Sequence, residues 1–222
     1  MIPFADDAPR RGTPWVTWAL ILMNVYVFYH ETLLSGPELY AFFRQWAVVP
    51  RDFFTGPTPY ITLVSAMFLH GSWLHLLGNM LFLWVFGDNV EGRLGSLRYL
   101  AFYLVTGVLG NALHILTHPT STVPALGASG AVAGVLGGYW VAFPGAQVRT
   151  LLFLGIFITV VRLPAFLMLL YWFLLQVIGG LSVFQQPGSE TVAYFAHIGG
   201  FLAGIFLMRL WGRRRPSWPG GF

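Results

Sequence analysis

A serine flanked by glycines and a histidine near the C-terminus are the residues of this sequence whose types and surroundings best suit catalysis. Ser129 stands in a Gly-Ala-Ser-Gly run at the start of an apolar segment that ends near Pro144, and His197 stands in a later apolar segment. A serine hydroxyl becomes an effective nucleophile when a base takes its proton, and histidine is the usual base. The pair therefore predicts nucleophilic catalysis, such as acyl transfer.

No carboxylate is placed to complete a Ser-His-Asp triad, because every Asp and Glu lies in an expected loop or at the end of an apolar segment. We therefore predict a dyad of Ser129 and His197. The serine run also departs from the GxSxG elbow of soluble hydrolases, since position 131 is alanine.

Small residues accompany both candidates at helical spacing. They are Gly130, Gly134 and Gly137 or Gly138 after the serine, and Gly200 and Gly204 after the histidine. Faces lined by glycine let two helices approach almost backbone to backbone, so we expect these two helices to pack together. The alternative is that the glycines only pack and that His197 hydrogen-bonds a carbonyl, although an ionisable group at membrane depth is a functional candidate by default.

Hydrogen-bond donors for a developing oxyanion are expected in the segment that begins near Trp73. His75 and Asn79 are four residues apart and share one helical face, and both side chains can donate. Together with the backbone N–H of Ser129, they predict an oxyanion hole. The alternative is that they join helices by hydrogen bonds, each worth about 1 kcal/mol in a membrane.

A metal site is a further alternative, which would use the histidines His70, His75, His114 and His118. No carboxylate joins them, and His70 and His75 do not share a helical face. We expect no metal and no cofactor.

Composition places the chain in a membrane. Hydrophobic residues make up 56% of it and charged residues only 9%, whereas about a quarter of the residues in soluble domains are charged. We expect one membrane domain over residues 1–222, without a separate soluble domain. There is no cysteine, which excludes disulfides, thiolate metal sites and a cysteine nucleophile.

The apolar segments predict an all-α bundle of six transmembrane helices. Their approximate ranges are 15–29, 73–86, 97–116, 127–144, 163–183 and 192–210. Residues 35–58 mix aromatic, charged and helix-breaking residues and predict an interfacial loop. Residues 151–161 would make roughly 16 Å of helix against a hydrocarbon core of about 30 Å, so we expect an interfacial segment there.

The basic residues indicate topology rather than nucleic-acid binding. All 12 are arginines, and six spans put ten of them on the side of the two termini and only Arg44 and Arg51 on the other side. By the positive-inside rule both termini are cytoplasmic, with short tails over about residues 1–13 and 211–222. Ser129 and His197 then lie toward the non-cytoplasmic face.

Taken together, these motifs resemble those of the rhomboid intramembrane serine proteases, in their compact bacterial type. The motif HxxxxHxxxN is matched by His70, His75 and Asn79, GxSG by Gly127, Ser129 and Gly130, AHxxGxxxG by Ala196, His197, Gly200 and Gly204, and ExRxG by Glu91, Arg93 and Gly95.

The resemblance implies a role for each group. Ser129 would be the nucleophile and His197 the general base, and His75, Asn79 and the Ser129 amide would form the oxyanion hole. The residues that would support them are His70, Gly127, Gly130, Gly200 and Gly204. Residues 35–58 would be a half-submerged loop, and the fifth span, with Trp172 and Phe173, would be the substrate gate.

The chain departs from the family at two places. Some members carry an aromatic residue under the histidine ring, where this chain has Ala133. The Trp-Arg pair found in the first loop of some members aligns with Ile61 and Thr62, so no role is carried over there.

The implied function is that of a serine endopeptidase that cuts peptide bonds in or near transmembrane segments of membrane proteins. Its partners would be transmembrane protein substrates and the lipid bilayer, with no nucleic acid. We expect a multi-pass protein of a prokaryotic inner membrane. The alternative is a catalytically silent rhomboid-like protein that binds client transmembrane helices.

Overall fold

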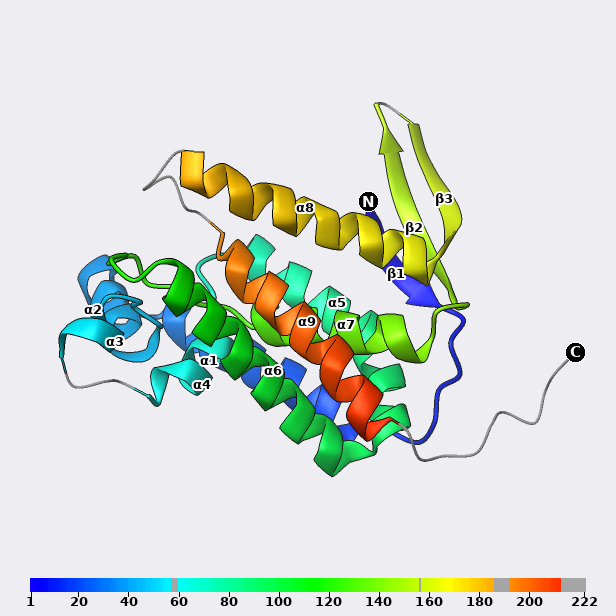
Figure 1. Ribbon diagram of the computed structural model, residues 1–222, viewed down its shortest axis with the longest axis horizontal. Coiled ribbons are helices and arrows are strands. Elements are labelled where there is room, and N and C mark those ends of the chain that lie inside the picture. The colour runs from blue at the N-terminus through cyan, green and yellow to red at the C-terminus, as the bar shows by residue number, and fades with distance from the viewer. Residues whose placement is uncertain (57–59, 156, 186–191, 213–222) are drawn as a thin grey trace, which may run out of the picture.

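The computed structural model describes residues 1–56, 60–155, 157–185 and 192–212, most of which are helical (Figure 1). The α-helices are α1 (Trp15–Thr32), α2 (Gly36–Trp46), α3 (Asp52–Thr55), α4 (Thr62–Ser65), α5 (Trp73–Leu94), α6 (Ser96–Thr117), α7 (Ser129–Ala142), α8 (Ala165–Gln185) and α9 (Tyr194–Trp211). A 3-10 helix, η1, covers Ala66–Phe68, and the strands are β1 (Ile2–Asp6), β2 (Gln147–Leu154) and β3 (Phe157–Pro164).

Among the described residues, three helices are long and apolar enough to cross a membrane: α6, α8 over Ala165–Val183, and α9. Thr62–Phe68 and Trp73–Leu94 pass the same test together, with a bend of 95° between them. The chain is therefore a helical membrane protein, and the number of six spans stays a prediction.

Helix α7 occupies the centre of the bundle. It packs against α5, α6 and α9, and its residues from Gly130 to Tyr139 are all buried. Its 14 residues make a helix of about 21 Å, shorter than the hydrocarbon core. A helix surrounded by protein does not need to span the lipid, so its first residue, Ser129, lies within the bundle.

A three-stranded antiparallel sheet, in the order β1-β2-β3, corrects the expectation of an all-α fold. Strand β2 pairs with β3 through partners such as Leu151 and Val160, and with β1 through Leu151 and Ile2. Residues 147–164 are rich in β-branched and aromatic side chains around Gly155, whose φ is +65°, and this composition favours a hairpin.

The sheet stands beside the start of α8 in Figure 1. On the face that packs near this helix, Thr150 is buried and its hydroxyl lies 3.7 Å from the sulfur of Met168. Residues 151–161 were expected to form a short interfacial segment, and their length was calculated for a helix, but most of them lie in β2 and β3. The expected tail over residues 1–13 contains the edge strand β1.

Helix α5 extends well past the expected end of the second span at Phe86, to Leu94. The extension is stabilised by Val90 and Leu94, which are buried, and by Glu91. The Glu91 carboxylate accepts hydrogen bonds from the backbone N–H groups of Val16 at 3.0 Å and Thr17 at 2.8 Å. These groups lie at the start of α1, where a helix offers its own N–H groups no acceptor. A carboxylate at this helix N-terminus is also favoured by the helix dipole.

The expected loop over residues 35–58 contains helices as well. Helix α2 begins with a capping box, in which the Ser35 backbone N–H donates to Glu38 at 2.9 Å. Residues 57–59 lie outside the described part of the chain, as do the polar turn over 186–190 and the C-terminal tail with Arg213, Arg214 and Arg215.

Candidate active site

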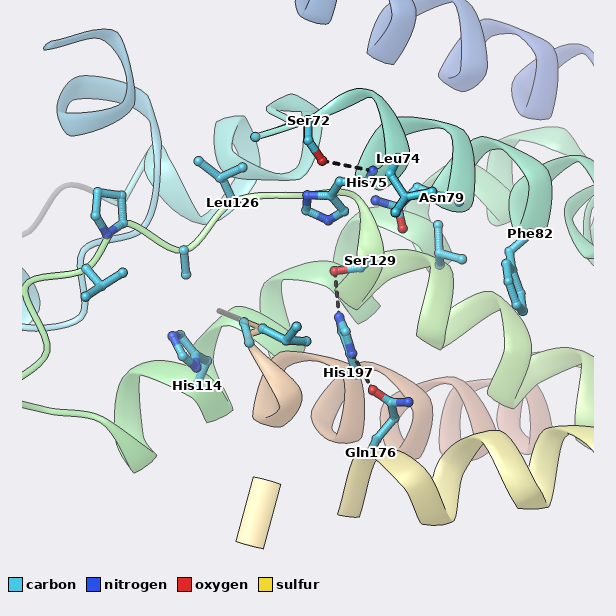
Figure 2. A pocket seen from close by; sticks show the side chains of 18 of the residues that line it. Ser72, Leu74, His75, Asn79, Phe82, His114, Leu126, Ser129, Gln176 and His197 are labelled. Atoms are coloured by element: carbon cyan, nitrogen blue, oxygen red, sulfur yellow. Dashed lines mark hydrogen bonds between the residues drawn. The ribbon is translucent and has the colours of Figure 1, made fainter. Parts of the chain in front are cut away.

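Ser129 and His197 are in direct contact, although 68 positions separate them in the sequence. The Oγ atom of Ser129, at the first residue of α7, lies 2.7 Å from the Nε2 atom of His197, in the first turn of α9 (Figure 2). Both residues are half-buried. A hydroxyl at this distance can donate its proton to an unprotonated imidazole nitrogen.

Glycines allow α7 and α9 to bring these side chains together. A Cβ atom on Gly200 would overlap the carbonyl oxygen of Gly130, and one on Gly204 would overlap that of Gly134. The glycines of α7 also face a second neighbour, because a Cβ atom on Gly134 would collide with Thr106 of α6. These glycines therefore let α7 fit between α6 and α9, whereas the sequence predicted a single neighbouring helix.

The expected oxyanion donors lie across the same cavity from His197. Figure 2 shows the His75 ring and Asn79 on α5, on the other side of Ser129. Gly127 passes directly by the imidazole: its φ is +128°, and a Cβ atom there would lie 2.7 Å from the His75 ring. Helix α5 begins at Trp73, shortly before His75. The Ser72 hydroxyl caps this helix by accepting the backbone N–H of His75 at 3.2 Å.

His70 supports this side of the site. Its Nε2 atom lies 3.0 Å from the amide nitrogen of Asn79, and both side chains are buried. Its backbone N–H donates to the carboxylate of Glu31, at the end of α1, at 3.2 Å. Asn79 has two amide hydrogens, so one remains for another acceptor when the other is donated to His70.

A cavity of about 640 Å³ contains these polar groups. Ser129, His197, His75 and Asn79 line it, and its other walls include apolar side chains from three helices, namely Phe82, Val132, Leu136 and Trp172. Such a combination of apolar walls and a few convergent polar groups is typical of binding sites for organic ligands.

Gln176, which none of the sequence motifs identified, contacts the other nitrogen of the histidine. Its Oε1 atom lies 2.8 Å from Nδ1 of His197 (Figure 2). Gln176 is buried on α8, one turn after Trp172, whose ring centroid is 6.0 Å from that of His197. The available signal was a carboxamide in the middle of an otherwise apolar helix, since polar side chains in such helices face the bundle interior.

The histidine ring has an aromatic neighbour, although position 133 does not supply it. Ala133 is fully buried, as its place in α7 requires, and Trp172 of α8 lies beside the imidazole instead. In the described part of the chain no group of three or more His, Asp or Glu side chains is arranged to hold a metal ion.

Known proteins with similar sequences share one family. A family model described as Rhomboid domain matches residues 57–214. Rhomboid protein 1, mitochondrial, of Saccharomyces cerevisiae is 30% identical over 142 residues, which cover 62% of this chain and 39% of that protein. RHOMBOID-like protein 5 of Arabidopsis thaliana is 29% identical over 211 residues, which cover 92% and 60%. Rhomboid-like protease 3 of Toxoplasma gondii is 29% identical over 160 residues, which cover 72% and 55%.

The chain thus spans 39% to 60% of the length of these three relatives. One of them is named as a protease, and another as mitochondrial. Because an organellar protein is among these relatives, the expected prokaryotic inner membrane stays a prediction.

Proposed function

The chain belongs to the rhomboid family, and on that basis we propose that it is an intramembrane serine endopeptidase that hydrolyses peptide bonds in or near the transmembrane segments of other membrane proteins. The observation that carries the proposal is the 2.7 Å hydrogen bond between Ser129 Oγ and His197 Nε2. A serine paired with a base at this distance is the arrangement that acyl transfer requires.

The reaction begins when His197 Nε2 takes the Ser129 proton as Oγ attacks the scissile carbonyl carbon. The resulting tetrahedral intermediate collapses when the imidazolium gives its proton to the leaving amine, which leaves an acyl group on Ser129. Water then attacks this ester, with His197 again taking a proton, and Ser129 regains its hydrogen as the new carboxyl group departs.

The oxyanion of each intermediate would be stabilised by His75, Asn79 and the backbone N–H of Ser129. The location of His75 and Asn79 on the cavity wall supports this assignment. Hydrogen-bond donors fixed before the reaction stabilise developing charge without reorganising, and removal of one typically costs 100- to 1,000-fold in kcat, about 3 to 4 kcal/mol.

The substrate would enter the cavity as an extended segment. Within a helix, a peptide carbonyl is hydrogen-bonded and shielded by side chains, so a transmembrane substrate must unwind before Ser129 can reach it. The apolar walls formed by Phe82, Leu136 and Trp172 suit side chains of such a substrate. We therefore expect membrane proteins, rather than soluble ones, as substrates.

The direct test is cleavage of single-span model substrates by the purified protein in liposomes. Wild-type protein and the Ser182→Ala variant are expected to cleave, and Ser129→Ala is not. Ser182 is a matched control because it is an exposed serine on α8 whose hydroxyl bonds the Gly179 carbonyl. Cleavage by Ser129→Ala contradicts the mechanism. Binding of substrate helices without cleavage by wild type favours the silent client-binding alternative.

We also propose six spans with both termini on the cytoplasmic side, supported by ten of the 12 arginines falling there in that topology. The absence of cysteine makes a clean test available. Thr13→Cys and Thr122→Cys introduce one thiol each at exposed positions on the two expected sides. A membrane-impermeant maleimide added from outside is expected to label Thr122→Cys alone, and labelling of Thr13→Cys instead overturns the orientation.

A further inference from the structure

We propose that Gln176 is a positioning residue that holds His197 in the tautomer with its proton on Nδ1, so that Nε2 is free to accept the serine proton. The inference rests on the proposed function and adds a third member to the site. It takes the place that a carboxylate holds in the Ser-His-Asp triad, and it comes from α8, a different helix from either member of the dyad.

The directions of the hydrogen bonds follow from the chemistry of the partners. The Gln176 side chain has two contacts: Nε2 lies 3.1 Å from the backbone carbonyl oxygen of Trp172, and Oε1 lies 2.8 Å from Nδ1 of His197. A carbonyl oxygen only accepts, so the amide nitrogen must face Trp172. The amide oxygen also only accepts, so Nδ1 of His197 must carry the proton.

The tautomer then determines what happens at the other nitrogen of the ring. A neutral imidazole has one protonated and one unprotonated nitrogen. With the proton on Nδ1, Nε2 presents its lone pair to Ser129 Oγ, 2.7 Å away, and the serine donates. The chain of hydrogen bonds runs in one direction from Ser129 through His197 and Gln176 to the Trp172 carbonyl.

An amide suits this location better than a carboxylate would. Only 28% of the most apolar stretch of α8 is buried inside the protein, so most of this helix is available to contact lipid. A charged side chain in such a helix is costly. A neutral amide with both its donor and its acceptor bonded avoids that cost, and it still orients the ring, although it stabilises the imidazolium less than a carboxylate does.

The location also links the base to α8. Trp172 and Gln176 lie one turn apart on the same face, and both contact His197. Because a hydrogen bond of 2.8 Å is lost when its atoms separate by about 1 Å more, a small displacement of α8 releases the ring. The base is therefore fully oriented only while α8 is packed against α9.

The test compares Gln176→Leu, Gln176→Glu and the control Ser182→Ala in liposomes. Gln176→Leu removes the acceptor with similar side-chain size and is expected to lower kcat by about 10- to 100-fold, with KM changed less than about twofold. Gln176→Glu keeps an oxygen acceptor and is expected to recover most of that loss. Ser182, like Gln176, bonds a carbonyl of its own helix, and its replacement should change neither constant.

The tautomer itself is read by nitrogen NMR of histidine-labelled protein, with the His197 signals identified by difference from His197→Asn. Wild type should show a protonated Nδ1 and an unprotonated Nε2, and Gln176→Leu should show a mixture of tautomers. A wild-type ring protonated on Nε2, equal losses of kcat in the Leu and Glu variants, or wild-type kcat in Gln176→Leu each overturns the inference. Failure of wild type to cleave, with Nδ1 protonated, refutes the proposed function and leaves the tautomer assignment standing.

Discussion

Gly200 lies so close to Gly130 that a Cβ atom on Gly200 would overlap the Gly130 carbonyl oxygen. The contact joins α7 to α9 within one turn of Ser129 and His197. The serine and the histidine can therefore hydrogen-bond only because two backbones meet without side chains between them. Close approach of this kind is the usual means by which transmembrane helices associate, since lipid supplies no hydrophobic drive between them.

Replacement of this glycine is expected to separate the two helices. Gly200→Ala should lower the thermal unfolding temperature in detergent and reduce cleavage at least tenfold, because the obstructing atom is backbone and cannot rotate away. Gly36→Ala is the control, since Gly36 is exposed at the start of α2 and a Cβ atom there would meet nothing within 4 Å. Wild-type stability and activity in Gly200→Ala would contradict the described packing.

A second glycine tests the contact with the oxyanion side. Gly127→Ala should disturb the His75 ring as well as strain the backbone, because Gly127 has a φ of +128° and a Cβ atom there would lie 2.7 Å from the imidazole. Gly95→Ala carries the backbone strain alone, since its φ is +82° with nothing within 4 Å. Each of the two substitutions is expected to reduce the free energy of unfolding by about 1 to 3 kcal/mol.

Activity per folded molecule separates the two variants. It should fall at least tenfold in Gly127→Ala and stay near wild type in Gly95→Ala. Equal activity in the two variants would mean that the location of His75 does not matter for the reaction.

Glu91 does not line the cavity, and we expect it to contribute to stability. Its carboxylate accepts four hydrogen bonds, from the backbone of Val16 and Thr17 and from the hydroxyls of Thr17 and Ser96. Glu91→Gln replaces one acceptor oxygen with a donor that faces other donors, and should reduce the free energy of unfolding by about 1 to 3 kcal/mol. Glu38→Gln, at an exposed helix start, should change it much less. Unfolding at unchanged denaturant concentration in Glu91→Gln would refute this role.

Stability is also expected to depend on pH through Asp6 in β1. Burial raises the pKa of the Asp6 carboxyl above its usual value, partly opposed by the hydroxyl of Tyr139, which donates to it. A raised pKa in the folded state means that the folded protein binds the proton more tightly than the unfolded chain. The stability from this group is thus present below about pH 4, the usual Asp pKa, and is lost as pH rises through the raised value.

Asp6→Asn removes this titration. The measurement is the unfolding temperature in detergent from pH 4 to pH 7, in which the variant should decline less than wild type. A decline of the same size in both proteins would show that Asp6 does not contribute.

The helices of the core could be predicted from the sequence because their signals are local. The apolar segments around Ser129 and His197 and the glycine spacing within them indicate helices that pack closely, and the structure has helices there. The hairpin over residues 147–164 was not predicted, because the length of its apolar residues was calculated for a helix. Their β-branched composition favours strands instead. Its pairing with residues 2–6 could not be found locally, since about 145 positions separate the partners.

In the candidate site, too, residues within local motifs could be predicted, whereas a contact between distant helices could not. Ser129, His197, His75 and Asn79 could be selected from motif spacing alone. Gln176 could not be assigned in that way, because its partner lies on a different helix, and only the packing of α8 against α9 brings the amide to the imidazole. The end of α5 was also set too early, at Phe86, because Gly87, Asp88 and Asn89 indicated the end of the apolar segment. The helix continues to Leu94, and its buried Glu91 is satisfied by α1.

The reactivity of Ser129 toward a fluorophosphonate probe tests the central claim most directly, because the probe needs an activated hydroxyl and no knowledge of the substrate. Folded wild-type protein in liposomes should be labelled at Ser129, as located by mass spectrometry, and the His197→Asn variant should react at least 100-fold more slowly while remaining folded. Labelling of both proteins at the same rate, or no labelling of the folded wild type, would contradict a serine activated by His197.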